Sequence, residues 1–279
     1  MAASRPTAIC AALLLAAAAQ SAFAQRLSYQ DLSGGVPDDG PQLDYEVAQE
    51  APAPAAKTPD AATASEPAKE RGFLQYGLLD RLEWIPRHGQ DSYSWDLSGF
   101  LGGPTNRLWL SSVGDGTAGG SLDYLELQAL FSRSVSGWDL QAGLRYDARP
   151  HPQRVYATAG IQGDATDRLW LAAYAYLSHE GELSGRINAQ YNQPIIGALV
   201  LQPSFELDAY ATDVPELGIG SGLAFGEAGL RLRYEIAAAF APYVGISWER
   251  SFGRTASFAR AAGEAPASRS LVLGIRSEF

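Results

Sequence analysis

The sequence contains almost no sulfur, because Met1 and Cys10 are the only methionine and cysteine among its 279 residues. A mature chain that begins beyond them has no thiol, thioether or disulfide, which excludes a disulfide-stapled secreted domain. Lysine is almost absent as well, since Lys57 and Lys69 are the only two. The formal net charge is −10 and no block of basic residues is present, so we expect no nucleic-acid partner.

Residues 1–24 have the layout of a cleaved secretory signal peptide. Arg5 precedes an apolar stretch, and the tripeptide Ala-Phe-Ala at 22–24 is typical of a cleavage site. The apolar run is too short to span a bilayer comfortably, which disfavours a retained anchor. Cys10 precedes most of that run, whereas a lipid-modified cysteine would follow it. We therefore expect an exported protein without a lipid anchor.

Residues 25–70 are rich in alanine, proline, aspartate, glutamate and serine, as in APAPAAKTPDAATASEPAKE at 51–70. Large apolar residues are few and show no periodicity. Such a segment cannot bury enough surface to offset the entropy lost on ordering. We predict a disordered tail that lies in the periplasm.

Residues 71–279 alternate between apolar and polar residues with a period of two, which indicates β-strands. In WDLQAGLRYD (138–147) every second residue is Trp, Leu, Ala, Leu or Tyr, and the residues between them are mostly polar. Most runs are about ten residues long, the length that a tilted strand needs to cross a bilayer. About twelve runs are predicted, near 73–86, 92–102, 106–113, 120–133, 137–147, 153–162, 167–178, 182–192, 198–210, 222–235, 241–250 and 269–279.

The polar face of these strands distinguishes a membrane barrel from a soluble sandwich, the other fold that such alternation permits. It carries arginine beside aspartate and glutamate but no lysine. The planar guanidinium suits paired contacts in a crowded lumen, whereas a face in bulk water would favour lysine. Short connections also alternate with longer ones such as 211–221 and 251–268. We predict an all-β fold, a transmembrane antiparallel β-barrel of about 12 strands spanning 71–279.

The lumen is the first candidate site. Asp80 does not fit the alternation, since it shares a face with Leu82 and Trp84, so a β-bulge or a misplaced boundary is expected there. The inward-facing charged residues either line a polar conduit or weak cation site, or simply pair with one another. Those predicted to face inward are Arg81, Glu83, Asp96, Glu126, Asp139, Arg145, Arg186, Glu206, Asp208, Glu227, Arg231, Arg233, Glu249 and Arg276.

The final strand, SLVLGIRSEF, ends in an aromatic residue. Outer-membrane barrels present such a strand to the machinery that inserts them. We therefore expect Phe279 to be recognised by the barrel-assembly machinery, and the apolar face of the barrel to contact outer-membrane lipid.

Several motifs resemble the copper resistance protein B family of Gram-negative outer membranes, among them DRLEW (80–84), NRLWL (106–110) and LELQALFSRSVSGWDLQAGLRYDARP (125–150). The resemblance runs from about residue 73 to the end. It implies an outer-membrane barrel that handles copper together with periplasmic copper-handling proteins, such as a copper-binding oxidase. Family members commonly carry a Met- and His-rich amino-terminal region, but the segment 25–70 has neither residue.

Three histidines remain as copper ligands once sulfur is excluded. His88, His151 and His179 fall in predicted extracellular loops, with acidic residues near them in sequence. They either form an imidazole and carboxylate site for Cu(II) or Zn(II), or are unlinked loop histidines. Nothing in the sequence brings the three loops together.

We expect a role in copper resistance, with copper handled or passed at the outer membrane. The alternative is a small-solute pore or structural barrel without direct metal binding. An enzyme is disfavoured, because Ser178 and His179 are adjacent on a strand and point to opposite faces. No Gly-x-Ser-x-Gly, phosphate-loop or zinc-helix motif is present.

Overall fold

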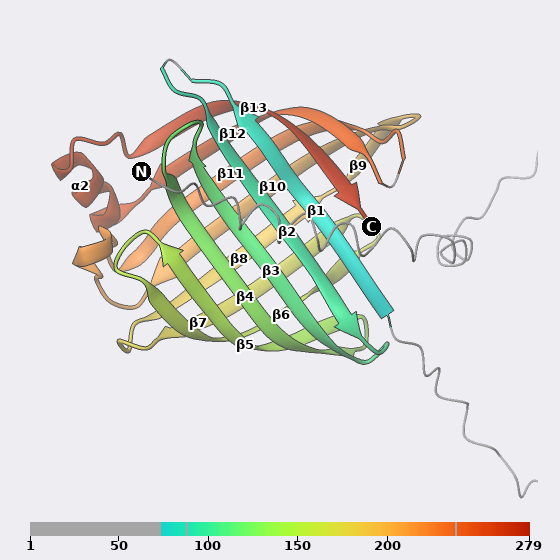
Figure 1. The fold of residues 1–279 in the computed structure, drawn as a ribbon, viewed down its shortest axis with the longest axis horizontal. Helices are drawn as coiled ribbons and strands as arrows, with labels where there is room; N and C mark the ends of the chain where they lie inside the picture. Colours follow the sequence, from blue (N-terminus) through green and yellow to red (C-terminus); the bar gives the residue numbers. More distant parts are fainter. Residues whose placement is uncertain (1–73, 88, 238) are drawn as a thin grey trace, which may run out of the picture. The chain divides into compact units, whose positions relative to one another are not determined.

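The computed structural model describes residues 74–87, 89–237 and 239–279. The predicted signal peptide (1–24) and tail (25–70) lie outside the described residues. The described chain forms an antiparallel β-barrel in which strands pair with their neighbours in sequence, except that β8 and β9 both pair with β10 (Figure 1). The pairings β1–β13 and β10–β11 close the ring.

The strands match the predicted runs closely, and the predicted fold class is confirmed. The strands β8 and β9 both pair with β10 and are separated only by Asn192. They therefore count as one strand of the barrel wall, which has twelve strands in all. The strands are β1 (Leu74–Ile85), β2 (Ser92–Gly102), β3 (Asn106–Thr117), β4 (Leu122–Val135), β5 (Trp138–Arg149), β6 (Arg154–Thr166), β7 (Leu169–Ser178), β8 (Leu183–Tyr191), β9 (Gln193–Ile196), β10 (Leu199–Tyr210), β11 (Gly222–Tyr234), β12 (Ala241–Ser251) and β13 (Ala267–Glu278).

The alternation in sequence becomes an alternation of faces. In β13, Leu271 is 50% exposed and Leu273 46%, whereas Val272 between them is fully buried. The exposed leucines point outward, where a bilayer would cover them, and the opposite face points into the barrel. The apolar outer surface is therefore the lipid-facing surface.

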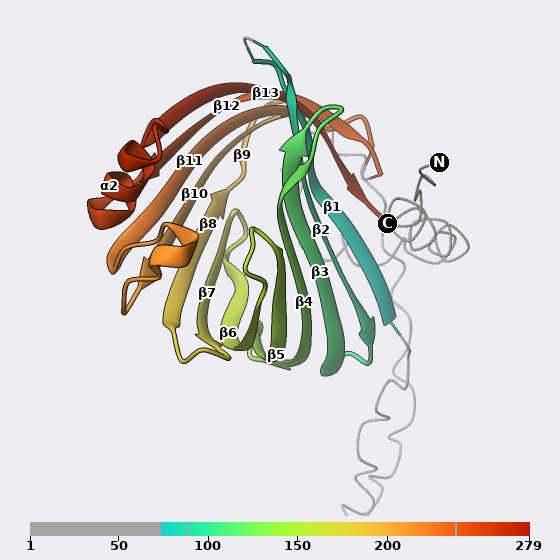
Figure 2. The same ribbon diagram turned by 60° about the vertical axis from the view of Figure 1, so that its left-hand side comes forward.

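The two ends of the barrel differ in their connections. One end carries tight turns together with the chain's carboxyl terminus (Figure 1). The other carries the 3-10 turn η2 (Pro215–Leu217) between β10 and β11 and the helix α2 (Gly253–Ala261) between β12 and β13 (Figure 2). The sequence predicted long connections there, but not the helix. No helix among the described residues is long and apolar enough to cross a membrane.

A β-bulge in β1 explains why Asp80 does not fit the alternation. The pairing register with β2 shifts between Leu79 and Arg81, and the register with β13 shifts between Leu79 and Leu82. The extra residue restores the predicted register on both sides of it. As a result, Asp80 and Arg81 both make contacts inside the barrel.

The barrel closes on the carboxyl-terminal residue. Phe279 and Gly77 exchange backbone hydrogen bonds, with N···O distances of 2.6 and 2.9 Å. The ring of Phe279 lies directly over the Cα of Gly77, where a Cβ would collide with it. Glycine at position 77 therefore provides the space into which the terminal aromatic ring packs.

Candidate functional site in the barrel interior

The interior of the barrel contains a cavity of about 1030 Å³. Arg231 lines a smaller space of about 70 Å³ that shares Arg81 with the main cavity. Two predicted residues lie outside both linings: Asp139 pairs with Arg107 at 3.5 Å, and Arg233 pairs with Glu235 at 2.9 Å. Eleven of the fourteen predicted inward residues line the main cavity, namely Arg81, Glu83, Asp96, Glu126, Arg145, Arg186, Glu206, Asp208, Glu227, Glu249 and Arg276.

The cavity wall is acidic. No lysine or histidine belongs to the wall as far as the structure describes it. Six arginines do: Arg81, Arg87, Arg145, Arg186, Arg250 and Arg276. Thirteen carboxylate residues oppose them: Asp80, Glu83, Asp96, Asp115, Asp123, Glu126, Asp147, Asp164, Glu206, Asp208, Glu227, Glu249 and Glu278. An excess of carboxylates in a confined space attracts cations and repels anions.

The first group of ion pairs joins strands on opposite sides of the lumen. Arg186 on β8 lies 3.3 Å from Glu126 on β4, although β5, β6 and β7 separate these strands. The same guanidinium pairs with Asp208 at 2.8 Å. Glu126 also forms an ion pair with Arg145 at 3.0 Å, and Arg145 pairs with Asp147 at 2.7 Å. These five side chains form a continuous charged crossbar.

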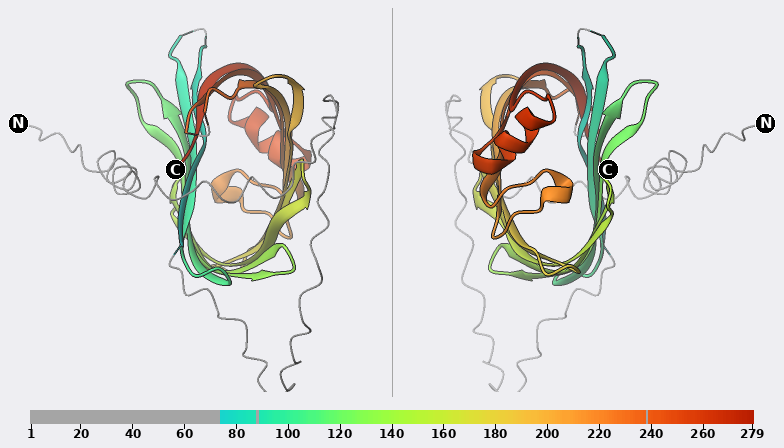
Figure 3. Two further views of the ribbon diagram at one scale, coloured as in Figure 1. Left: turned by 90° about the vertical axis from the view of Figure 1, so that its right-hand side faces the viewer. Right: turned by 90° about the vertical axis from the view of Figure 1, so that its left-hand side faces the viewer.

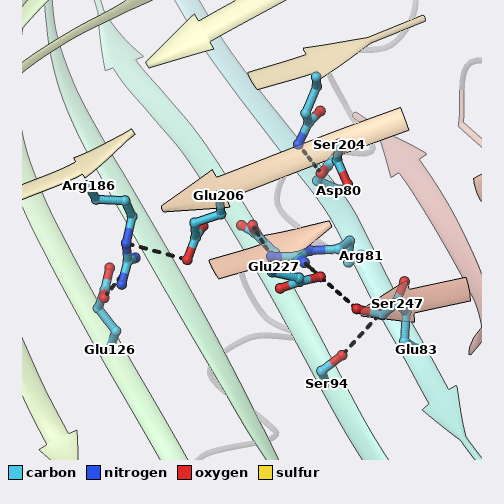
Figure 4. A network of polar contacts seen from close by, with 12 residues as sticks. Asp80, Arg81, Glu83, Ser94, Glu126, Arg186, Ser204, Glu206, Glu227 and Ser247 are labelled. Atoms are coloured by element: carbon cyan, nitrogen blue, oxygen red, sulfur yellow. Dashed lines mark hydrogen bonds and ion pairs between the residues drawn. The ribbon is translucent and has the colours of Figure 1, made fainter. Parts of the chain in front are cut away.

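A second group joins β1 to β11 across β12 and β13. Arg231 lies 2.7 Å from Glu83, and both side chains are only 4% exposed. Beside them, Arg81 contacts Glu227 at 3.5 Å (Figure 4). Arg81 also contacts Asp96 at 3.3 Å. Glu206 and Glu227 are direct cross-strand neighbours, a repulsive arrangement that the arginines on either side offset.

The bulge residue makes a third crossing. Asp80 on β1 accepts from Gln190 on β8 at 3.2 Å and from Arg276 on β13 at 3.3 Å. At least four strands separate β1 from β8 in either direction around the ring. We call the three groups together the partition, since their side chains reach across the lumen between strands that are not neighbours.

Because the partition is buried, removing one of its charged side chains should lower the stability of the barrel. A buried charge that loses its partner is destabilised by several kcal/mol, so each arginine and carboxylate holds the other in place. Arg145 is fixed further by aromatic rings, because its guanidinium lies 5.0 Å from the ring centre of Tyr156 and 4.6 Å from that of Tyr176.

The histidines lie away from the partition. His151 is in the β5–β6 connection and His179 in the β7–β8 connection, both at the end that carries α2. His179 Nδ1 accepts from the backbone N–H of Val155 at 3.3 Å. His88 lies outside the described residues. Within those residues no three His, Cys, Asp or Glu side chains are arranged to hold a metal ion. The three-histidine site stays a prediction.

The hydroxyl of Ser178 and the imidazole of His179 form no hydrogen bond with each other, which a nucleophile and its base would need. Ser178 Oγ donates to Glu182 at 2.6 Å, and His179 Nε2 lies 3.4 Å from Glu180. The serine is buried, whereas half of the histidine side chain is exposed.

Sequence reasoning missed the contacts at the mouth that carries α2. Arg154 pairs with Glu216 at 2.6 Å, and Asp213 pairs with Arg254 at 2.6 Å. Asp213 and Glu216 lie in a connection and Arg254 in α2, where no alternation indicates a position. Arg154 begins β6, but the alternation of a strand does not indicate a partner in a loop. The backbone N–H of Ser221 donates to Asp213 and lowers the pKa of that carboxyl, and the charge of Arg254 lowers it further.

A closed barrel with an apolar exterior and a charged interior is the fold of an outer-membrane β-barrel protein. A solved structure of the NanC porin shares this fold, with a TM-score of 0.50 over 71% of this chain and 99% of the porin. The sequences are 14% identical, so the likeness shows the fold alone.

The family follows from sequence comparison. The family model described as "Copper resistance protein B precursor (CopB)" matches residues 74–279, and the chain belongs to this family. It is 42% identical over 205 residues to a "Copper resistance protein B homolog" of Pseudomonas syringae pv. tomato (strain ATCC BAA-871 / DC3000), covering 73% of this chain and 69% of that protein. It is 39% identical over 188 residues to "Copper resistance protein B" of Escherichia coli, covering 67% and 63%.

The fold and the family together assign the chain to the outer membrane and to copper resistance. The resemblance stated from sequence motifs is thereby confirmed.

Proposed function

We propose that the barrel passes copper ions across the outer membrane through its acidic interior. The observation that carries this proposal is the cavity wall, in which thirteen carboxylate residues face six arginines. Such a wall concentrates cations in the lumen. The described residues contain no sulfur, so the cargo that fits best is Cu(II), which accepts oxygen ligands, rather than Cu(I).

The partition suits passage better than storage. Most of its carboxylates already pair with arginine, which leaves a passing cation only weak interactions with any one of them. Conduction requires binding that is favourable enough for an ion to enter and weak enough for it to leave. A sequence of partly neutralised carboxylates along the lumen meets both conditions.

The direct test is copper flux into proteoliposomes that contain a copper-sensitive dye. Asp115 and Asp164 are suitable targets, because neither forms an ion pair within the described chain and both line the cavity. We expect Asp115→Asn with Asp164→Asn to reduce Cu(II) flux several-fold at low salt and to have little effect at high salt, where charges are screened. Glu264→Gln is the matched control, since Glu264 is exposed and outside the cavity wall. Equal flux through all three proteins at low salt would contradict the proposal.

The histidines form a separate part of the proposal. We propose that His88, His151 and His179 bind Cu(II) at the mouth before it enters. Calorimetry on the detergent-folded protein tests this with Cu(II) and Cu(I), beside the variant in which all three are alanine. Saturable Cu(II) binding that disappears in the variant is expected. Binding that persists in the variant would exclude the histidines.

The remaining expectations concern processing and partners. We propose that residues 1–24 are a cleaved signal peptide, that Phe279 is recognised by the barrel-assembly machinery, and that outer-membrane lipid surrounds the barrel. A periplasmic copper-binding oxidase is the proposed soluble partner, and no nucleic acid is bound. The barrel has no catalytic role in this proposal, which the hydrogen bond from Ser178 to Glu182 supports.

The alternative function is a small-solute pore or structural barrel without direct metal binding. The close pairing of arginine with carboxylate in the partition supports it, because such pairs fill an interior whether or not an ion passes. Flux of copper and of an uncharged sugar at matched concentrations separates the two. Sugar flux without copper selectivity favours the alternative.

A further inference from the structure

The connection between β10 and β11, residues 211–221, folds toward the barrel axis, and we call it the strap. Views along the barrel show its turn η2 inside the ring of strands (Figure 3). Leu217 and Ile219 of the strap belong to the wall of the main cavity. The strap therefore occupies part of the mouth through which the lumen opens.

One side of the strap is anchored firmly to α2 and its surroundings. Asp213 pairs with Arg254, which is the second residue of α2, at 2.6 Å. The backbone N–H of Gly220 donates to the buried hydroxyl of Thr255 at 2.9 Å. Beneath these contacts, Val214 packs with Ile219 and Ala224 in a small apolar cluster. Polar and apolar contacts together fix this side.

On its other side the strap makes one ion pair among the described residues, and the backbone N–H of its first residue, Ala211, donates to the carbonyl oxygen of Leu183 on β8 at 2.8 Å. Glu216 Oε1 lies 2.6 Å from Nη2 of Arg154, at the start of β6. The strands β7 and β8 separate β6 from β10, so this pair spans part of the mouth. Arg154 is buried and is also held from the rim by Glu182 at 3.2 Å, whereas the side chain of Glu216 is 49% exposed.

We propose that the strap is a gate for the lumen and that the Glu216–Arg154 pair is its latch. The asymmetry of the contacts carries this inference, because several contacts fix the strap to α2 and β11, whereas only the Glu216–Arg154 ion pair among the described residues ties its turn η2 to β6. Arg154 keeps Glu182 as a partner after release, so opening leaves no unpaired buried charge. The role of the gate in copper passage rests on the proposed function, but the motion itself does not.

The strap can be tested without copper, by single-channel conductance in potassium chloride. We expect Glu216→Gln to raise the ratio of open to closed time about tenfold, which corresponds to the loss of one charged hydrogen bond of about 1.4 kcal/mol. Glu182→Gln is the matched control, because it removes the other partner of Arg154 but no contact of the strap. The conductance of this control is expected to match the unaltered protein.

A second measurement tests the gate even if the partition, and not the strap, limits the current through the barrel. Leu217→Cys places a thiol on the strap, and the only natural cysteine, Cys10, precedes the predicted cleavage site. A bulky maleimide added outside cells should label this thiol about tenfold faster when Glu216→Gln is also present. Glu182→Gln should not accelerate labelling.

The outcomes separate the two proposals. An increase in conductance or labelling that is specific to Glu216→Gln supports the gate, even if copper flux fails. Unchanged conductance and labelling, in a protein that runs as a folded barrel on a gel, overturns the gate and leaves the copper proposal standing.

Discussion

The partition and the mouth of this barrel use the same arginine–carboxylate pair in opposite ways. In the partition, Arg231 and Glu83 are each 4% exposed and come from strands that pair with a neighbour on both sides. At the mouth, Glu216 is 49% exposed and lies on a loop. Burial turns an ion pair into a structural element, whereas exposure leaves it weak enough to open.

The largest effect is expected from breaking the partition at its most buried pair. Arg231→Met leaves Glu83 charged and without its arginine in the interior, which should cost about 3–5 kcal/mol of unfolding free energy. Urea unfolding in detergent, followed by gel mobility, measures this loss. Adding Glu83→Gln removes the isolated charge and should restore much of the stability. A double variant as unstable as the single one would show that packing, and not charge, is responsible.

A smaller effect is expected at the crossbar. Arg186 is 14% exposed, so Arg186→Gln should cost about 1–3 kcal/mol, less than the loss of Arg231. Because Arg186 bridges β8 to β4 across the lumen, its removal should also raise conductance. A variant that is less stable but conducts no better would indicate that this contact does not restrict the lumen.

The anchored side of the strap is expected to depend weakly on pH. The pKa of Asp213 is lowered in the folded protein, so its stabilising contribution is present above the unfolded pKa and is lost as the pH falls through the folded value. Strap amides should exchange more slowly than those of Asp213→Asn at pH 5, and this difference should shrink as the pH falls below the ordinary aspartate pKa. Hydrogen exchange measured on both proteins at each pH tests this. A constant difference would exclude the Asp213 charge as its cause.

The smallest effect is expected at the rim of the cavity. Glu249 is exposed and forms a hydrogen bond with Ser268 at 3.1 Å but no ion pair within the described residues. Glu249→Gln should change unfolding free energy by no more than about 0.5 kcal/mol. A loss comparable to that of Arg186→Gln would mean that exposure does not separate the two regions.

The same contrast decides what the sequence could predict. Period-two alternation determined the strands and the face of each residue, so Arg231 and Glu83 could both be assigned to the interior. It could not show that they would meet, because parity identifies a face and not a partner across the lumen. Asp80 was flagged as irregular, but its reach to Gln190 depends on the bulge. The strap and α2 have no such period, and the latch between Glu216 and Arg154 had no sequence signal.

The seam between β1 and β13 has a consequence for the order of folding. Leu78 pairs with Glu278, two positions that are 200 residues apart, whereas most other pairings join neighbouring strands. Closing so long a loop has a high entropic cost, so contacts of this kind form slowly and depend on the rest of the sheet already being in place. The docking of Phe279 over Gly77 is therefore expected to be the last step of barrel formation. Until that step β1 and β13 each have one unpaired edge, and these two edges are where aggregation is most favourable.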